Sequence, residues 1–503
     1  MIPLTLGLMM PTTASAIDDV NTRKLREAVT VNGILQHERA LQRIANNNDG
    51  TRASGTPGYD ASVDYVAQRL RQAGYQVTIQ AFTFPFFRNT APGTLEQASP
   101  TPTTYATGTF DYSATGDITG TVTAIDLVIP PTPTPSSTSG CEASDFPAAP
   151  AGPSVALIQR GTCNFEVKAA NAATAGYDAA IIMNEGQPGR EEPFIGTLGT
   201  PQTIPVVGLS AADGQALAAA VAAGPVTVHV TTSTETDLNR TTYNVLADSV
   251  PGQNSDEVVV VGAHLDSVLE GPGINDNGSG TSTILEIAEE MSELSYNKKN
   301  KLQRQVRFAF WGAEESNLLG SQFYVDHLTT KQLSKIYANL NFDMLGSPNY
   351  VRFVYDGDGS DSDPAGPPGS AQIEAILNDY LARQGLESEP TAFDGRSDYG
   401  PFIGVGIPAG GLFSGAEGEK TAEEAAIYGG MAGAPYDPCY HQACDDITNL
   451  NTKALFELGD AAAHATLVLA RSKTGLFEDG SRVTQRSAKV GVKMAGKGHA
   501  HVR

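Results

Sequence analysis

The chain has 503 residues, and its 33 Lys and Arg against 56 Asp and Glu give a formal charge of −23. This length allows two or more domains, and the acidic charge repels phosphate backbones, which argues against nucleic-acid binding. Hydrophobic residues make up 40% and charged residues 18%, a balance typical of a folded chain, and no run of eighteen apolar residues predicts a membrane span.

The N-terminal segment and the cysteines both indicate export. Residues 1–16 contain a short apolar stretch followed by small residues at 14–16, a pattern typical of a cleaved signal peptide. No basic residue precedes the apolar stretch, so an ordinary apolar N-terminus is the alternative. The four cysteines fall in two local pairs, which suits an oxidising compartment: Cys141 with Cys163, and Cys439 with Cys444. We expect a secreted protein, extracellular or periplasmic.

Helical periodicity predicts helices over 30–46 and 58–74, and alternation predicts a strand over 75–82. From about residue 98 to about 140 the composition changes to Thr, Pro, Gly and Ser. Within this stretch, residues 130–135 mark an extended segment without regular structure. Strands and a helix return at 155–158, 165–176 and 179–183.

After residue 240 the pattern alternates between strands and helices. Strands are predicted at 258–262, 306–311 and 336–344, and helices at 281–294, 319–328, 371–385 and 455–471. This alternation predicts an α/β fold with a mixed, mostly parallel sheet covered by helices on both faces. Reactive groups in such sheets gather at the carboxyl ends of the strands.

Imidazole and carboxylate groups follow these strands directly. They are His264 and Asp266 after the first strand, Asp276 before the first helix, Glu314 and Glu315 after the second strand, and Asp343 after the third. A later segment, 439–445, adds Tyr440 and His441 between two cysteines. Nitrogen and oxygen ligands without thiolates suit zinc, and several neighbouring carboxylates favour two ions over one.

Two local spacings suggest separate roles within this set. His264 and Asp266 share one face of an extended segment, so Asp266 can orient the imidazole from outside the metal shell. Glu314 and Glu315 point opposite ways, so one can bind metal while the other acts as a general base. Each element alone has a structural alternative: Asp276 as a helix cap, Asp343 as a satisfied buried carboxylate, and the Glu pair as a solvated turn.

Two resemblances give these motifs a context. The order His-x-Asp, Gly-x-x-Asp-Asn-Gly-Ser-Gly, Glu-Glu, Asp-Met-x-Gly and Cys-Tyr-His-x-x-Cys-Asp closely resembles the secreted leucine aminopeptidases of the co-catalytic dizinc exopeptidase family, and also the aminopeptidase Y group. Residues 155–186 resemble the protease-associated domain, with a generic small βαβ unit as the alternative. We therefore expect a signal peptide at 1–16, a catalytic domain at 17–97 and 236–471, a protease-associated insert at 98–235 and a basic, flexible tail at 472–503.

The family resemblance implies a role for each motif residue. It implies two zinc ions per chain, with Asp276 bridging them, His264 and Asp343 on one ion, and Glu315 and His441 on the other. By the same resemblance Glu314 is the general base, Tyr440 stabilises the oxyanion, Asp266 orients His264, and Arg396 borders the substrate site.

The implied activity is hydrolysis of the N-terminal residue, large and leucine-like by family default, from peptides with a free N-terminus. Three alternatives stay open: a dizinc carboxypeptidase, a glutaminyl cyclase-like transferase with one zinc, and a non-catalytic binding protein. No nucleic-acid or membrane partner is expected.

Overall fold

The computed structural model describes residues 20–254 and 256–477. The predicted signal peptide, 1–16, and the predicted basic tail from residue 478 onward lie outside the described residues. Within the described ranges, no helix combines the length and apolar character that crossing a membrane requires.

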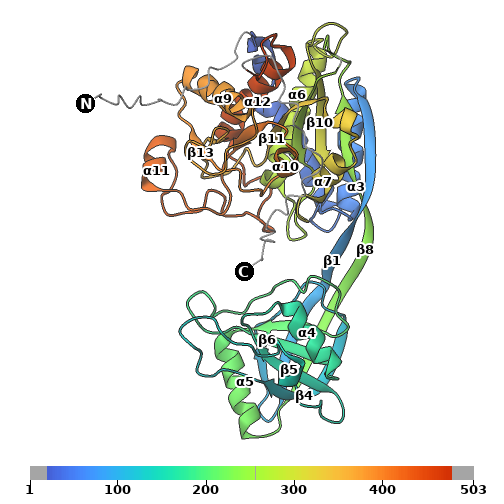
Figure 1. The fold of residues 1–503 in the computed structure, drawn as a ribbon, viewed down its shortest axis with the longest axis vertical. Helices are drawn as coiled ribbons and strands as arrows, with labels where there is room; N and C mark the ends of the chain where they lie inside the picture. Colours follow the sequence, from blue (N-terminus) through green and yellow to red (C-terminus); the bar gives the residue numbers. More distant parts are fainter. Residues whose placement is uncertain (1–19, 255, 478–503) are drawn as a thin grey trace, which may run out of the picture. The chain divides into compact units, whose positions relative to one another are not determined.

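The chain divides into two compact units, with boundaries between Phe84 and Pro85 and between Arg240 and Thr241. The change in composition placed the insert at 98–235, so the boundaries by contact lie outside the expected ones at both ends. The reason is that β1 (Gln76–Ser99) and β8 (Thr227–Asp248) continue as unbroken strands through both boundaries (Figure 1). Composition marks the loops of the insert rather than the strands that lead into it.

The unit formed by the two outer parts of the chain contains most of the helices. These are α1 (Arg23–Ala28), α2 (Val31–Asn46), α3 (Pro57–Gln72), α6 (Gly280–Glu293), α7 (Leu319–Asp326), α8 (Thr330–Leu333), α9 (Ser370–Arg383), α10 (Gly400–Gly404), α11 (Ala422–Tyr428) and α12 (Thr452–Arg471).

Its sheet runs in the order β13-β12-β14-β11-β9-β10-β8. The parallel centre consists of β10 (Gln305–Trp311), β9 (Val258–His264), β11 (Ile336–Phe342) and β14 (Ala409–Phe413). Antiparallel pairs join β8 to β10 and β12 (Phe353–Tyr355) to β14, while β13 (Glu389–Thr391) lies parallel to β12. The sheet is therefore mixed and mostly parallel, as the alternation predicted.

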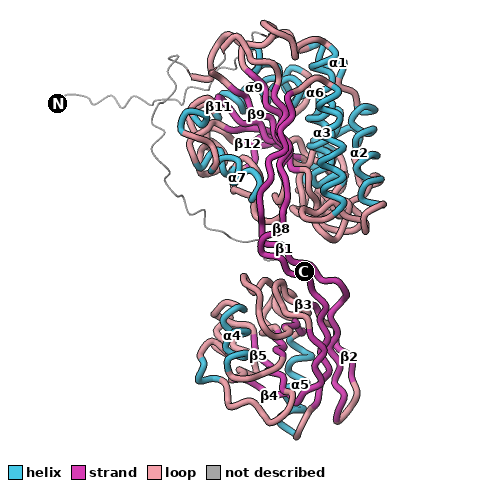
Figure 2. Tube along the Cα trace, turned by 90° about the vertical axis from the view of Figure 1, so that its right-hand side faces the viewer, coloured by secondary structure: helices cyan, strands magenta, loops and turns pink. Residues whose placement is uncertain are grey.

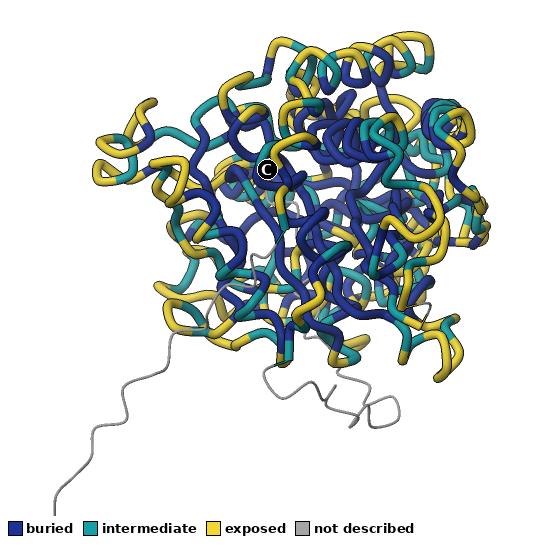
Figure 3. The backbone as a smooth tube through the Cα atoms, turned by 90° about the horizontal axis from the view of Figure 1, so that it is seen from above, coloured by how far each residue is buried: buried dark blue, intermediate teal, exposed yellow. Residues whose placement is uncertain are grey.

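Strand β9 shows why both faces of this sheet are covered. Val259 and Val261 belong to a core shared with α2, α3, α6 and α12, whereas Val258 and Val260 belong to a second core with α7 and α10. Figure 2 shows α1, α2, α3 and α6 on one side of the strands and α7 on the other. In Figure 3 the buried segments gather at the centre of the view and the exposed segments at its rim. A strand buried on both faces reads as a continuous apolar run, which is how residues 258–262 signalled β9.

Side-chain caps fix where several of these helices begin. The Thr30 hydroxyl accepts the Gly33 N–H at the start of α2. The Thr56 hydroxyl accepts the Tyr59 N–H at the start of α3, whose first residue is Pro57. Asn451 accepts the Lys453 N–H at the start of α12. Ser, Thr and Asn are favoured at these positions because they satisfy N–H groups that the first helical turn leaves unpaired.

The inserted unit has a parallel set of strands at its centre. Parallel pairs join β4 (Gly116–Ile125), β5 (Ser154–Gln159), β6 (Ala179–Met183) and β7 (Val206–Leu209), and β3 (Gly108–Thr109) lies antiparallel to β7. The short β2 (Thr103–Tyr105) pairs with β1. Helix α4 (Phe165–Thr174) packs on one face of the sheet and α5 (Ala211–Ala223) on the other, so two separate cores form.

Most predicted elements agree with the observed ones to within a few residues, and β6 spans the predicted 179–183. The strand predicted at 75–82 is only the start of β1, which continues to Ser99. The sequence did not predict β4, because its Thr and Gly residues lack a clear apolar alternation. Residues 130–135 form no helix or strand, as expected.

Candidate metal centre

The predicted site residues come from segments that follow the parallel strands. His264 is the last residue of β9, Glu314 and Glu315 follow β10, and Asp343 follows β11. Asp276 lies in the irregular turn Ile274–Ser279 that leads into α6. Because β9, β10 and β11 are parallel neighbours, their carboxyl ends meet at one edge of the sheet.

A first group of side chains surrounds the His264 imidazole. Its Nε2 lies 3.1 Å from Asp276 Oδ1 and 3.2 Å from Asp343 Oδ1. His264 is 1% exposed, so its imidazole is buried within the site.

A second group surrounds His441 and shares one residue with the first. His441 Nε2 lies 3.1 Å from Asp276 Oδ2 and 3.1 Å from Glu315 Oε2. The two oxygens of Asp276 thus face two different imidazoles. A carboxylate in this position is suited to bridge two cations.

The donor set and its spacing fit zinc. Two ligands at 2.0–2.1 Å from a tetrahedral zinc ion lie about 3.3 Å apart, close to the 3.1–3.2 Å between the imidazole nitrogens and the carboxylate oxygens. Each group offers one neutral nitrogen ligand and two oxygen ligands, with no thiolate. His264, Asp276 and Asp343 would hold one ion, and Asp276, Glu315 and His441 the other.

Glu314 lies next to these two groups of ligand candidates, but at a longer distance. Its Oε2 is 4.0 Å from His264 Nε2, farther than the ligand atoms are from one another. Burial raises the pKa of Glu314 well above its ordinary value; the His264 charge opposes this rise, and neighbouring Glu315 adds to it. A carboxylate whose pKa is raised is a stronger proton acceptor than an ordinary one.

Asp266 orients His264 differently from what the sequence suggested. The His264 Nδ1 lies 3.1 Å from the backbone carbonyl oxygen of Asp266 and 3.6 Å from its carboxylate Oδ1. The hydrogen bond from Nδ1–H therefore goes to the main chain, and the carboxylate contributes charge and accepts the Glu314 N–H at 3.3 Å. A hydrogen bond from Nδ1–H to either acceptor directs Nε2 toward the position of a metal ion.

Tyr440 and Arg396 lie together at the edge of the site. The Tyr440 ring stacks on that of His441 with 3.9 Å between centroids. Arg396 Nη2 donates to Tyr440 Oη at 3.4 Å, and its Nη1 pairs with Glu417 Oε1 at 2.8 Å. Arg396 therefore contacts both a predicted site residue and a salt-bridge partner.

Both expected disulfides are present. The Cys439–Cys444 bond closes the loop that carries Tyr440 and His441, and the Cys141–Cys163 bond lies in the inserted unit. A bond across so few residues restricts the loop that presents His441.

Three supporting residues were not singled out from the sequence. Buried Arg52 donates through Nε to the Pro272 carbonyl at 2.8 Å and through its Nη atoms to the carbonyls of Leu265 and Gly273, so it joins the segments carrying His264 and Asp276. Ser397 donates to Asp343 Oδ2, and Asp445 accepts two backbone N–H groups of the Asp276 turn. Asp445 is the last residue of the Cys-Tyr-His-x-x-Cys-Asp motif and Ser397 is the neighbour of Arg396, whereas nothing in the sequence pointed to Arg52.

Comparison with known proteins places this geometry in a family. The model described as "Peptidase family M28" matches residues 244–466, a range that includes all five ligand candidates. A protein named "Aminopeptidase" from Pseudomonas aeruginosa is 47% identical over 457 residues, covering 89% of this chain and 82% of that protein. The chain belongs to peptidase family M28. "Leucine aminopeptidase 2" from Arthroderma otae is 38% identical over 464 residues, covering 91% of this chain and 87% of that protein.

The insert and the fold also match members of this family. The PA domain model matches residues 119–217, which lie within the inserted unit, so this M28 peptidase carries a protease-associated domain. The structure titled as an aminopeptidase from Aneurinibacillus sp. strain AM-1 superposes with a TM-score of 0.65 at 25% identity, covering 90% of this chain and 97% of that one. A zinc aminopeptidase from Bacillus subtilis gives 0.62 at 26% identity, covering 90% and 98%.

Proposed function

We propose that this M28 peptidase is a zinc aminopeptidase that binds two zinc ions and removes the N-terminal residue from peptides. The observation that carries the proposal is the position of Asp276, whose two oxygens lie 3.1 Å from the Nε2 atoms of His264 and His441 respectively. In this proposal His264 and Asp343 complete one zinc site, and Glu315 and His441 complete the other.

The remaining residues then have separate tasks. When bound, zinc supplies Lewis acidity, which polarises a carbonyl group and makes a water molecule more acidic. Glu314 stands next to the ligands and accepts the proton of the attacking water, then returns it to the leaving amine. Asp266 keeps His264 in the tautomer whose Nε2 faces the metal.

Tyr440 is suited to donate a hydrogen bond to the oxyanion of the tetrahedral intermediate. Burial, together with the charges of Asp276 and Glu315, raises the pKa of Tyr440 well above its ordinary value. The phenol therefore keeps its proton at neutral pH. Arg396 Nη2 donates to the phenol oxygen and orients the ring at the border of the substrate site.

We propose peptides with a free N-terminus as substrates and a large apolar N-terminal residue, leucine-like, as the preferred one. The preference is supported by the relatives named leucine aminopeptidase 2. Export from the cytoplasm is supported by the two disulfides and by a 41% identical relative named as a probable lipoprotein aminopeptidase.

The test combines metal analysis with paired chromogenic substrates. We expect two zinc ions in the His264 and His441 groups, hydrolysis of leucine p-nitroanilide, and no hydrolysis of its N-acetylated form. Equal hydrolysis of both forms would contradict an aminopeptidase. Cleavage only at a free carboxyl terminus would instead indicate a carboxypeptidase, and cyclisation of N-terminal glutamine a cyclase.

A further inference from the structure

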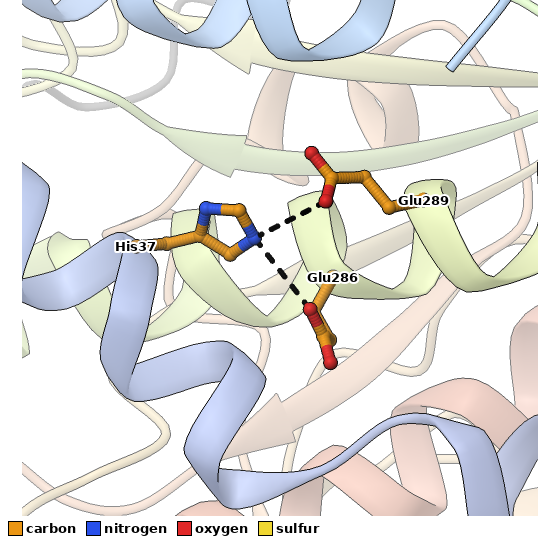
Figure 4. A group of neighbouring side chains, drawn as sticks. All are labelled: His37, Glu286 and Glu289. Atoms are coloured by element: carbon orange, nitrogen blue, oxygen red, sulfur yellow. Dashed lines mark ion pairs between the residues drawn. The ribbon is translucent and has the colours of Figure 1, made fainter. Parts of the chain in front are cut away.

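A second cluster of metal-ligand side chains lies away from the candidate metal centre, between helices α2, α3 and α6. It consists of His37 on α2 and of Glu286 and Glu289 on α6 (Figure 4). Glu286 and Glu289 are three residues apart, so they share one face of their helix. The side chains of His37 and Glu286 are 3% and 8% exposed, and that of Glu289 is 17% exposed.

A contact on the side of the ring away from the two carboxylates sets the orientation of the His37 imidazole. Its Nδ1 lies 2.7 Å from the hydroxyl oxygen of Tyr65 on α3. When Nδ1 donates to that oxygen, Nε2 is left with a lone pair. Figure 4 shows Nε2 directed at both carboxylates. This is the arrangement in which histidine binds a metal ion.

The distances from Nε2 are too long for hydrogen bonds. They are 3.6 Å to Glu286 Oε2 and 3.8 Å to Glu289 Oε2, whereas a nitrogen–oxygen hydrogen bond spans 2.7–3.2 Å. By comparison, His229 Nε2 in the same chain lies 2.7 Å from Oδ1 of the Asp117 carboxylate. Two ligands bound about 2.1 Å from a tetrahedral ion are about 3.4 Å apart, so the three atoms would have to close by a few tenths of an ångström around an ion. The spacing therefore leaves room for an ion between the three atoms.

The Glu286 carboxylate occupies a small space next to the backbone of α2. A Cβ on Gly33 would stand 1.8 Å from Glu286 Oε1, so a larger residue there would displace this carboxylate. The Thr30 N–H approaches the same oxygen at 3.4 Å. Within the described chain, Glu286 Oε2 accepts no hydrogen bond and faces only His37. A carboxylate buried to this degree without a paired charge is costly.

The charges around the cluster favour a divalent cation. Arg69 on α3 pairs with both oxygens of Glu289, with its Nε 2.6 Å from Oε1 and its Nη2 bonded to Oε2, and so balances that carboxylate. The charge of Arg69 also acts on Glu286, but Arg69 makes no ion pair with it among the described residues. A divalent ion would compensate Glu286 and share Glu289 Oε2, which also faces His37 Nε2, with Arg69. The partial exposure of Glu289 gives the ion access from solvent.

We propose that His37 Nε2, Glu286 Oε2 and Glu289 Oε2 bind a third divalent transition-metal ion, such as zinc, at a structural site that joins α2 to α6. One nitrogen and two carboxylate oxygens are ligands that zinc accepts. Helix α6 begins directly after the turn that carries Asp276. An ion at this site therefore connects α2 to the helix that follows this turn. Its binding to the folded state alone stabilises the protein.

The test counts zinc ions in the full-length protein equilibrated with zinc and then freed of excess metal. We expect three ions per chain in the parent and two in His37→Gln, with leucine p-nitroanilide hydrolysis unchanged. Glu289→Gln provides a second variant at a more exposed position, should His37→Gln fail to fold. His229→Gln is the matched control, because it also removes a histidine that pairs with a carboxylate, and it should keep three ions.

Thermal unfolding gives a readout that does not depend on activity. Added zinc should raise the Tm of the parent and of His229→Gln more than that of His37→Gln or Glu289→Gln. Two ions in an active parent would overturn the third site while leaving the proposed function intact. Three ions in Glu289→Gln and in a folded His37→Gln would also overturn it.

Discussion

The carboxylate of Asp445 accepts the backbone N–H of Asp276 at 3.0 Å, across 169 residues of sequence. Its other oxygen accepts the N–H of Asn275 at 2.9 Å, and the Ile274 N–H reaches the Asp445 carbonyl at 3.0 Å. Asp445 directly follows Cys444, which closes the His441 loop. One buried carboxylate therefore holds the turn of the bridging candidate against the loop of a second ligand candidate.

Replacing Asp445 by Asn should weaken zinc binding more than it weakens the fold. An amide keeps one acceptor but turns an N–H group toward a backbone N–H, which leaves a buried donor unsatisfied. Loss of a residue that orients metal ligands typically lowers metal affinity or activity by about 10–100-fold. Zinc retention against a competing chelator measures the effect, and circular dichroism monitors the fold. Asp446→Asn, at the adjacent residue, is the control and should retain zinc as the parent does. Unchanged zinc retention in Asp445→Asn would exclude this positioning role.

Glu314→Gln should abolish most of the activity while leaving the metal in place. The amide cannot take a proton from water, and loss of general-base catalysis typically costs about 10²–10⁴-fold in rate. Zinc content should stay at the parental value, because Glu314 Oε2 is 4.0 Å from the nearest ligand nitrogen. Glu293→Gln, at the exposed end of α6, should be fully active. A Glu314→Gln variant with normal kcat would remove Glu314 from the mechanism.

Tyr440→Phe should lower kcat by about 10²–10³-fold with little change in KM, the cost typical of losing one donor to an oxyanion. The ring that stacks on His441 remains, so zinc content should not change. Arg396→Gln removes the Nη2 contact to the phenol and the pair with Glu417. We expect a smaller loss of activity from it, because Tyr440 keeps its own proton. A larger loss in Arg396→Gln than in Tyr440→Phe would reverse the two assignments.

Lys168 in the inserted unit should make stability depend on pH. Burial lowers the pKa of Lys168 to about 8, and its amine donates to the Ser139 carbonyl. In the unfolded chain the amine titrates near 10.4. Between these two values the unfolded chain binds a proton that the folded chain has released, so stability rises with pH across this window.

Lys168→Met lacks this contribution, so the Tm of the parent minus that of the variant should increase between pH 7 and pH 10. Thermal unfolding followed by circular dichroism at several pH values measures the difference. Lys24→Met, at an exposed lysine of α1, should show no such trend. A Tm difference for Lys168→Met that stays constant over the range would show that the amine is charged in both states.

The sequence by itself determined many of the regular elements and the kinds of ligand at the candidate metal centre. Residues 258–262 predicted a strand buried on both faces because a continuous β-branched run suits that environment. His264, Glu315 and Asp343 were visible as ligand candidates because they end or follow strands, and parallel strands bring their carboxyl ends to one edge. The resemblance of the ordered motifs to dizinc aminopeptidases then assigned a role to each residue.

Only the tertiary structure decided which groups support those residues. The Arg52 guanidinium and the Asp445 carboxylate act on backbone groups, and a backbone carbonyl or N–H leaves no mark in the sequence. The Nδ1 of His264 donates to the main chain of Asp266 rather than to its carboxylate for the same reason. His37 and Glu286 come from distant helices whose packing, not spacing, brings them together. Local periodicity records burial and direction along a segment, whereas contacts between distant segments exist only once the chain has folded.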